Sequence, residues 1–304
     1  MNLLLTGCFN YSEEQIKTLE TLGYTIYFQQ YEADELSFLP EDIDTAVCNG
    51  LFLSHDIDQF SNLKYIQLTS AGFDRVPMDR INERGIRIHN ARGVYSIPMA
   101  EWALFRVLEH YKQGGYFQKE QVQKRWTKHR GLREIYGIRV AVVGAGNVGQ
   151  EVAMRFKALG AETTGFDVHT DDTFGFDHMT LTDSFKKRVG EFDVVILTAP
   201  LLPSTKGLIN KDVLNSMKEN AVIVNIARGG LIDESALCEV LAQRKDIYAA
   251  LDVFEVEPLP SDSPLWTLDN VALSPHNSFV GDANNERMFN VIYYNLKEFI
   301  ETKI

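Results

Sequence analysis

Short apolar runs alternate along the whole chain with segments in which apolar residues recur at helical spacing. In the first part of the chain, the runs that predict strands lie at residues 2–7, 24–29, 45–49 and 64–70. A helix is predicted between the first two strands, because Ser12 and Gln15 form a capping box and Gly23 is a suitable C-cap residue. An alternation of this kind is typical of a parallel sheet covered by helices.

A second alternation occupies the rest of the chain. Its predicted strands lie at residues 139–143, 161–166, 193–199, 221–227, 247–253 and 271–274. A long helix from residue 96 to about 118 precedes these strands, and a final helix from about 284 to 303 follows them. The pattern predicts an α/β protein with two doubly wound parallel sheets.

The two sheets predict two domains, one of them discontinuous. If the final helix rejoins the first sheet, residues 1–95 and 280–304 form one domain, and residues 96–279 form the other. We expect the first to bind the substrate and the second a nucleotide, with the site in the cleft between them.

The composition is that of a globular protein, and we expect no targeting segment. With 304 residues and 45% hydrophobic residues, the chain can build about two domains. The N-terminal sequence MNLLLTGCFN lacks a basic region, and no apolar run has the length of a membrane span. The three cysteines, Cys8, Cys48 and Cys238, have no metal-type spacing and make an odd number. We therefore expect buried thiols, no metal site and a cytoplasmic location.

The net charge of −12 argues against nucleic acid and anionic membranes as partners, because both would be repelled. Residues 112–139 are basic instead, and they include Trp126. This stretch is either a solvated connector or a contact surface for a second subunit. The second alternative predicts a homodimer.

The sequence RVAVVGAGNVG, residues 139–149, is typical of a dinucleotide-binding turn. An apolar strand precedes Gly144, Gly146 and Gly149, which have GxGxxG spacing, and a helix over residues 147–159 follows. The first glycine allows a sharp reversal, the second lets backbone N–H groups approach a pyrophosphate, and the third lets the helix pack on the strand. The spacing alone also occurs in ordinary turns, so the next strand is needed to support the prediction.

Asp167 ends that next strand, eighteen residues after Gly149. A carboxylate at this position can accept hydrogen bonds from both ribose hydroxyls of NAD. It would repel the extra phosphate of NADP, and the nearby Asp171 and Asp172 would add to that repulsion. The sequence therefore favours NAD over NADP.

Further polar residues follow later strands, where open α/β sheets bind ligands. Arg228, in NIARGGLID, can bind a carboxylate with two parallel hydrogen bonds and polarise a carbonyl group. Glu255 and Glu257 lie in DVFEVEPLP, and position alone does not choose between them. His276, in VALSPHN, lies at a strand end behind a proline, and it is the only one of the seven histidines so placed. Each could instead be an ordinary surface residue, but together they predict a catalytic site.

The order of these motifs resembles a known family. The glycine motif is followed by TAPLLPSTKGLIN, MKENAVIVNIARGGLIDESAL, ALDVFEVEPL and SPH. Over about residues 95–280 this series resembles the D-isomer-specific 2-hydroxyacid dehydrogenases, and YIQLTSAGFD and SIPMAEWAL extend the likeness more loosely. The resemblance implies a Rossmann nucleotide domain, a flavodoxin-like substrate domain, and reversible NAD-dependent reduction of a small 2-oxo acid to a D-2-hydroxy acid.

The resemblance also implies roles for single residues. Arg228 would hold the substrate carboxylate and polarise its keto group, His276 would be the general acid, and Glu257 would hold and charge the imidazole. The implied cofactor-binding residues are Gly144, Ala145, Gly146, Asn147, Val148, Gly149, Asp167, Ala199, Pro200, Thr205, Ile226, Ala227, Asp252 and Ser278. The implied substrate-binding residues are Asn49, Gly50, Ala71, Gly72, Arg228 and His276.

Departures from the family pattern concern the substrate. Members that act on 3-phosphoglycerate usually place an arginine in the loop formed here by residues 48–52, and we expect no added regulatory domain, so a phosphorylated substrate is disfavoured. Arg75 either reaches a distal anionic group or is solvated. Glyoxylate, hydroxypyruvate and pyruvate all stay open as substrates.

Two alternatives share this fold. A scaffold that senses NAD, similar to the co-repressor relatives of the family, would retain the same residues but usually has a partner-binding extension or an exposed apolar groove. A formate dehydrogenase would not need Glu257, because hydride leaves formate without proton transfer. The sequence favours the 2-hydroxyacid dehydrogenase.

Overall fold

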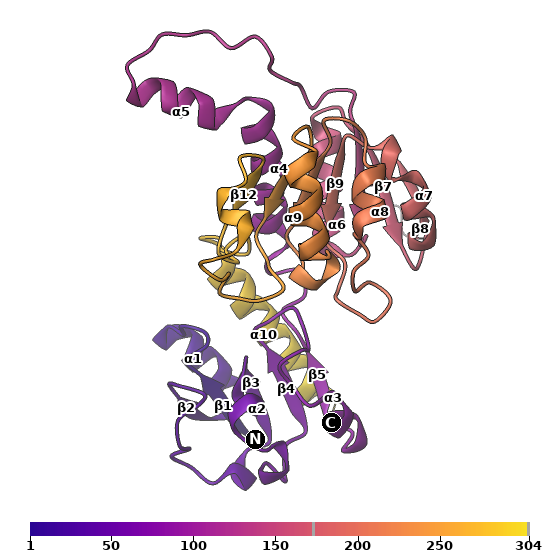
Figure 1. Ribbon diagram of the computed structural model, residues 1–304. Helices are drawn as coiled ribbons and strands as arrows, with labels where there is room; N and C mark the ends of the chain where they lie inside the picture. Colours follow the sequence, from indigo (N-terminus) through magenta and orange to yellow (C-terminus); the bar gives the residue numbers. More distant parts are fainter. Residues whose placement is uncertain (172–173, 303–304) are drawn as a thin grey trace. The chain divides into compact units, whose positions relative to one another are not determined.

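The computed structural model describes residues 1–171 and 174–302, and the chain divides into two units (Figure 1). Unit 1 consists of Met1–Tyr95 and Gly281–Ile304, and unit 2 consists of Ser96–Val280. Asp172, which we expected to disfavour NADP, lies outside the described residues.

Unit 1 is built on a five-stranded parallel sheet with the strand order β2-β1-β3-β4-β5. Its strands are β1 (Asn2–Thr6), β2 (Thr25–Gln29), β3 (Thr45–Cys48), β4 (Tyr65–Leu68) and β5 (Arg87–His89). Its helices are α1 (Glu13–Thr21), α2 (Leu51–Ser54), α3 (Met78–Glu83) and α10 (Asn284–Glu301), with 3-10 turns at Pro40–Asp42 and Ile57–Gln59. In the register of the sheet, Leu4 pairs with Tyr27 and with Ala46. This strand order is the flavodoxin-like one, which confirms the fold predicted for this part of the chain.

The last helix of the chain completes the core of unit 1. Apolar residues recur at helical spacing on one face of α10, namely Met288, Ile292, Leu296 and Phe299. They pack with Leu3 and Leu5, whereas Leu4 belongs to the core on the opposite face of the sheet. Alternate residues of β1 therefore fill two cores, as the pleat of a strand requires. Two hydrogen bonds fix the helix further, from Asn295 to Gln67 (2.7 Å) and from Tyr24 to the carbonyl of Leu296 (3.1 Å).

Unit 2 contains a seven-stranded parallel sheet with the order β12-β11-β10-β9-β6-β7-β8. Its strands are β6 (Arg139–Val143), β7 (Glu162–Asp167), β8 (His178–Leu181), β9 (Val194–Leu197), β10 (Val222–Asn225), β11 (Tyr248–Leu251) and β12 (Val271–Leu273). Its helices are α4 (Ser96–Tyr111), α5 (Gly114–Val122), α6 (Asn147–Ala158), α7 (Phe185–Arg188), α8 (Lys211–Ser216) and α9 (Glu234–Gln243), with 3-10 turns at Thr182–Ser184, Val189–Glu191, Gly229–Leu231 and Pro264–Thr267. Counted from β6, the first six strands have the Rossmann order, which confirms the doubly wound prediction.

Both faces of this sheet are buried. Val143 and Leu197 point into one core, and Val142 and Ile196 point into the other. The central strands therefore appear in the sequence as continuous apolar runs instead of alternating ones.

The predicted single helix over residues 96–118 is wrong, because the structure has two helices there. α4 ends at Tyr111, and Gln113 adopts a left-handed backbone conformation with φ of 55° before α5 begins at Gly114. A residue in this conformation cannot continue a right-handed helix. The apolar spacing gave no sign of the break, since α5 is mostly polar and its buried residue is Glu120.

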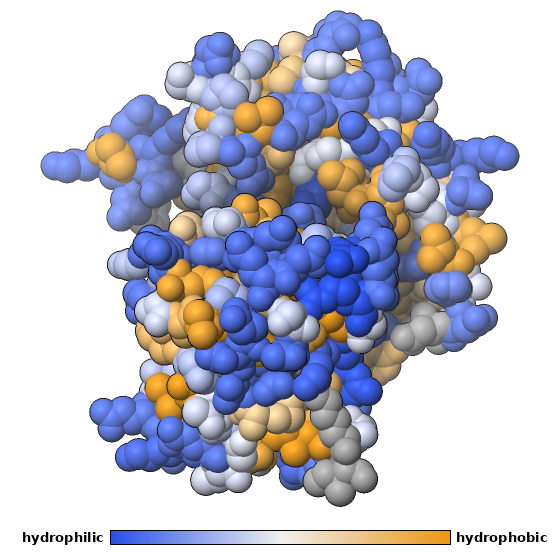
Figure 2. Space-filling view, turned by 90° about the horizontal axis from the view of Figure 1, so that it is seen from below, coloured by the Kyte–Doolittle hydropathy of each residue, from blue (hydrophilic) through white to orange (hydrophobic). Residues whose placement is uncertain are grey.

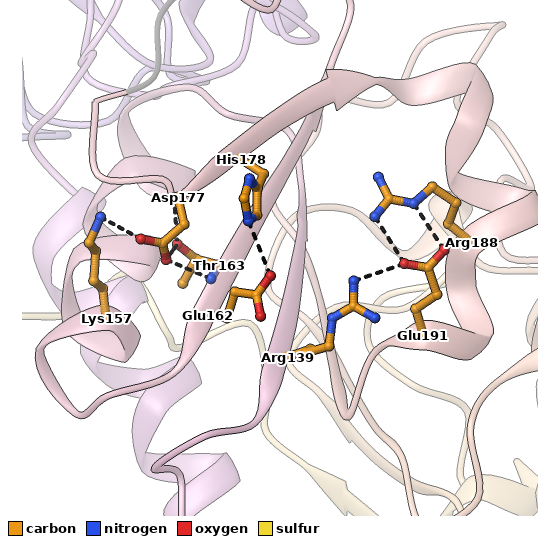
Figure 3. Close-up of polar contacts among 8 residues, drawn as sticks. All are labelled: Arg139, Lys157, Glu162, Thr163, Asp177, His178, Arg188 and Glu191. Carbon is orange, nitrogen blue, oxygen red and sulfur yellow. Dashed lines mark hydrogen bonds and ion pairs between the residues drawn. The ribbon is translucent and has the colours of Figure 1, made fainter.

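Two edge strands, β5 and β8, were not predicted, because neither has an apolar run. Figure 3 shows how polar contacts hold β8 against β7. Asp177 accepts hydrogen bonds from the backbone N–H (2.9 Å) and hydroxyl (3.0 Å) of Thr163 and pairs with Lys157 (2.7 Å), and His178 lies 3.1 Å from Glu162. In the same view Glu191 accepts hydrogen bonds from the guanidinium groups of Arg139 and Arg188.

The surface carries hydrophilic residues over most of the face drawn in Figure 2, with apolar residues in small separate groups. Within residues 1–171 and 174–302, no helix combines the length and apolar character of a membrane span. The buried thiol expected at Cys48 is confirmed, and Cys238 is partly buried. Cys8 is exposed as a whole residue where the chain leaves β1, but its sulfur lies against the hydroxyls of Thr6 (2.9 Å) and Thr69 (3.4 Å), and burial raises the pKa of its thiol to about 11.

Candidate functional site

The glycine turn between β6 and α6 lies tightly against the end of β9. Gly144 has a φ of +100°, and a Cβ atom at this residue would lie 2.5 Å from the backbone nitrogen of Ala199. The hydroxyl of Thr198 donates a hydrogen bond to the carbonyl of Gly144 (2.6 Å). Only glycine fits both the backbone conformation and the space at this reversal.

The other two glycines of the motif have opposite surroundings. A Cβ atom at Gly149 would lie 2.1 Å from the carbonyl oxygen of Gly144, so the start of α6 packs directly on the turn. A Cβ atom at Gly146, the N-cap residue of α6, would meet no atom within 4 Å. The turn is therefore open on the side of Gly146, where Asn147 and Val148 begin the helix, and a pyrophosphate fits against such a turn.

Asp167 ends β7 beside the glycine turn. One carboxylate oxygen accepts a hydrogen bond from the backbone N–H of Ala145 (2.6 Å), and the other accepts one from Val168 (2.7 Å). Because an ionised carboxylate has about four acceptor positions, it can still accept hydrogen bonds from two ribose hydroxyls. These residues fit the adenosine and phosphate parts of a dinucleotide.

The loop after β9 contributes Ala199, which is buried, and Pro200, which is exposed. Thr205 holds this loop, because its hydroxyl donates to the carbonyl of Pro200 (2.7 Å) and accepts from the N–H of Leu202 (2.8 Å). The strand order reverses between β6 and β9, so the loop and the glycine turn flank the position at which doubly wound sheets bind nucleotides.

The turn after β10 holds Arg228. Asn225 is fully buried, and its amide accepts from the N–H of Ala227 (3.1 Å) and donates to the carbonyl of Arg228 (2.9 Å). The guanidinium of Arg228 donates to the carbonyl of Ala227 (2.8 Å), and Ile226 and Ala227 are both buried. Sequence reasoning missed Asn225, although an asparagine at the end of an otherwise apolar strand is itself a signal.

Gly229 brings this turn against the following loop. A Cβ atom at Gly229 would lie 1.9 Å from the carbonyl carbon of Phe254, so the two backbones touch. The loop that carries Glu255 and Glu257 therefore lies directly beside the Arg228 turn.

The structure distinguishes the two glutamates. Glu257 Oε2 lies 2.8 Å from Nδ1 of His276, and its Oε1 accepts a hydrogen bond from the N–H of Phe254 (3.0 Å). Glu255 instead exchanges backbone-to-carboxylate hydrogen bonds with Glu234 at the start of α9 (3.1 and 3.4 Å). Of the two carboxylates, only that of Glu257 is paired with the histidine.

Asp252 organises the backbone around His276. Its carboxylate is fully buried, accepts hydrogen bonds from the N–H groups of Asn277 and Ser278 (both 2.8 Å), and also binds the hydroxyl of Ser274. The N–H of His276 donates to the backbone carbonyl of Asp252 (2.7 Å), and His276 has a left-handed φ of 49°. Asp252 therefore positions the histidine loop, a role that the sequence did not indicate.

Unit 1 places four of the predicted residues at the carboxyl ends of β3 and β4. The N–H groups of Asn49 and Gly50 donate to the carboxylate of Glu32 (2.7 and 2.5 Å), which sequence reasoning missed. In the loop after β4 the carbonyls of Ala71 and Gly72 accept from Asn90 (2.6 Å) and Ser70 (3.0 Å). The N–H groups of Ala71 and Gly72 find no protein acceptor in the described part of the chain.

Comparison with known proteins places this arrangement in a family. The model described as "D-isomer specific 2-hydroxyacid dehydrogenase, NAD binding domain" matches residues 104–278. D-3-phosphoglycerate dehydrogenase of Methanocaldococcus jannaschii is 36% identical over 87% of this chain, and the match spans 51% of that protein, about half its length. Hydroxypyruvate reductase of Thermotoga maritima is 34% identical, and the match spans 82% of each chain.

A solved structure agrees with these sequence matches. The D-isomer specific 2-hydroxyacid dehydrogenase of Xanthobacter autotrophicus, determined with NADPH and MES, superposes with a TM-score of 0.80 at 26% identity, covering 99% of this chain and 95% of the other.

Proposed function

Because the chain belongs to the D-isomer specific 2-hydroxyacid dehydrogenase family, we propose that it reduces a small 2-oxo acid to the D-2-hydroxy acid, reversibly and with NADH. Residues 104–278 are its NAD(P)-binding domain. The hydrogen bond between His276 and Glu257, at the same sheet edge as the glycine turn, is the observation that carries the proposal.

The proposed reaction adds a hydride and a proton across the keto group. When bound, the nicotinamide cofactor would supply the hydride that adds to the keto carbon. The keto oxygen becomes negative as this happens, and His276 donates the proton from Nε2. Glu257 accepts the hydrogen bond from Nδ1, which orients the ring and balances its positive charge. In the oxidation direction a neutral His276 takes the proton from the hydroxyl group.

Two further groups act on the substrate carboxylate in this proposal. Arg228 would hold it and polarise the neighbouring keto oxygen, since a guanidinium offers several donors in one plane. The backbone N–H groups of Ala71 and Gly72 would receive the carboxylate as well. Their lack of a protein acceptor among the described residues supports this role.

The histidine–glutamate pair also bears on the alternative of a formate dehydrogenase. Oxidation of formate releases a hydride and carbon dioxide, so no proton has to be moved. A hydrogen-bonded His276 and Glu257 favours a reaction that includes proton transfer.

We propose NAD as the preferred cofactor. Asp167 lies at the end of β7, where its carboxylate would accept the ribose hydroxyls and repel a 2′-phosphate. Asp171 would add a second negative charge.

We also propose a homodimer formed through α5 and residues 123–134. Figure 1 shows this part projecting from the rest of unit 2, and Trp126 on it is 98% exposed. A hollow of about 710 Å³ lies between Phe117 and Trp126. The segment is basic whereas the chain carries a net charge of −12, so its charge complements the surface of a second copy.

The test is a panel of glyoxylate, hydroxypyruvate and pyruvate, each assayed with NADH and with NADPH by loss of the reduced nicotinamide. The proposal expects turnover of at least one acid with NADH. His276→Ala should abolish turnover while NADH binding, measured by titration, stays intact, and Arg228→Ala should weaken substrate capture and turnover together. Tight NADH binding without turnover of any acid would contradict the proposal and favour a sensing scaffold.

A further inference from the structure

The side chain of Glu32 extends over the carboxyl ends of neighbouring strands in the sheet of unit 1. Glu32 follows β2, yet Oε1 of its carboxylate accepts hydrogen bonds from the hydroxyl of Thr6 at the end of β1 (2.7 Å) and from the N–H of Asn49 after β3 (2.7 Å). Oε2 accepts from the N–H of Gly50 (2.5 Å). The ring of His55 lies 2.9 Å from the backbone carbonyl of Glu32, which fixes the loop itself.

Within residues 1–171 and 174–302, the charge of Glu32 has no lysine or arginine as its partner. Neutral donors surround it, and no lysine or arginine of the described residues forms an ion pair with it. The side chain is partly buried, so water screens its charge less than that of a fully exposed carboxylate. A negative field therefore persists at this edge of the sheet.

This field lies next to the proposed substrate loop. β3 and β4 are hydrogen-bonded neighbours, and such strands are about 4.8 Å apart, so the loop with Asn49 and Gly50 adjoins the loop with Ala71 and Gly72. If Ala71 and Gly72 receive the substrate carboxylate, the Asn49 loop borders the space beside that carboxylate.

We infer that Glu32 determines substrate specificity by excluding 2-oxo acids with a second anionic group. It satisfies the N–H groups of Asn49 and Gly50, which would otherwise bind a distal phosphate or carboxylate, and it repels such a group. The accepted class is then 2-oxo monocarboxylates whose side chains are small and uncharged. This inference rests on the proposed function.

The sharpest test compares hydroxypyruvate with its 3-phosphate, which differ only in the phosphoryl group. The wild-type protein should have a kcat/KM at least about tenfold lower for the phosphorylated acid, because like charges at this range repel. Glu32→Gln keeps the size of the side chain and removes its charge. It should raise the ratio of kcat/KM for the phosphorylated acid to kcat/KM for hydroxypyruvate about tenfold. Glu35→Gln is the matched control: it removes an equal charge from the same loop, and its exposed carboxylate makes no hydrogen bond in the described structure, so the ratio should stay within about twofold.

The outcomes separate this inference from the proposed function. If the wild-type protein reduces neither acid, nor glyoxylate or pyruvate, the proposed function fails. If it reduces hydroxypyruvate but Glu32→Gln leaves the ratio unchanged, only the role of Glu32 is overturned. If Glu32→Gln does not fold, the comparison of the two acids with the wild-type protein still decides. A wild-type preference for the phosphorylated acid that is lost in Arg75→Ala would overturn the inference.

Discussion

His276 and Glu257 are nineteen residues apart in the sequence, and their side chains form a hydrogen bond of 2.8 Å between Nδ1 and Oε2. The two residues come from loops after neighbouring parallel strands, β12 and β11. Asp252, at the end of β11, fixes the backbone of the His276 loop through the N–H groups of Asn277 and Ser278. The backbone at the carboxyl ends of β11 and β12 therefore sets the positions of both side chains.

Glu257→Gln should lower kcat for 2-oxo acid reduction about 100-fold, because the amide cannot balance a charged imidazole. Binding of NADH, measured by fluorescence titration, should not change. The matched control is Glu255→Gln, since Glu255 contacts the start of α9 and not His276. Equal losses in the two variants would contradict the assignment of Glu257.

Asp167→Ala should shift the cofactor preference toward NADPH. The loss of one negative charge beside the ribose should raise the ratio of kcat/KM for NADPH to that for NADH by about 10-fold or more. The KM for NADH should rise as well, because the carboxylate also holds the N–H of Ala145. Asp171→Ala should move the ratio less, and an unchanged ratio in Asp167→Ala would remove that residue from cofactor selection.

Gly229→Ala should destabilise unit 2 and impair catalysis together. Its Cβ atom would lie 1.9 Å from the carbonyl carbon of Phe254, so one backbone has to move, at a cost of about 1–3 kcal/mol. Differential scanning calorimetry should find the Tm lower by about 5 °C. Gly115→Ala places a Cβ in open space on α5 and should leave the Tm unchanged or slightly higher, and a similar drop there would argue against the steric explanation.

His110 makes the protein less stable in mild acid. Burial, with a smaller contribution from Arg133, lowers the pKa of His110 from 6.5 to about 4, and its ring stacks on Tyr248 at 3.9 Å. Between these two values the unfolded chain binds a proton at this residue that the folded chain does not, so stability falls as the pH decreases through this window. His110→Phe keeps an aromatic ring on Tyr248 and removes the titration. The difference in Tm between about pH 7.5 and about pH 5 should therefore be smaller in the variant than in the wild type.

Trp126→Ser should shift the protein from dimer to monomer if the projecting segment forms the interface. Light scattering after size exclusion at micromolar concentration measures the mass directly. Trp266→Ser is the control, because Trp266 is 55% exposed and lies outside the segment. A wild-type protein that is monomeric under these conditions would refute the homodimer.

The central elements could be predicted from the sequence because several local signals coincide there. β6 has the predicted bounds, and α6 begins at the predicted residue, since a β-branched run, three spaced glycines and a helical apolar pattern mark the same turn. Edge strands such as β8 lack such signals. Polar contacts hold β8 at one side of the sheet, and its residues need no apolar pattern.

The candidate site was predictable in its residue types but not in its pairings. Which glutamate contacts His276 depends on how two loops meet, and sequence distance carries no information about that. Glu32 reaches across β1 to the loop after β3, a contact that exists only once the sheet has formed. Asn225 and Asp252 are buried and hold the functional loops by hydrogen bonds to their backbones. The sequence could not reveal this role, because burial is a property of the fold.

The place of α10 in the core of unit 1 has a consequence for biosynthesis. Met288, Ile292, Leu296 and Phe299 are among the last large side chains to reach that core. A nascent chain that has released only its first hundred residues therefore exposes the apolar face of β1 to water. Unit 2 is a single continuous segment of the chain, so it can finish folding on the ribosome first. Unit 1 cannot complete its core until α10 has been synthesised, although most of its residues are made earlier.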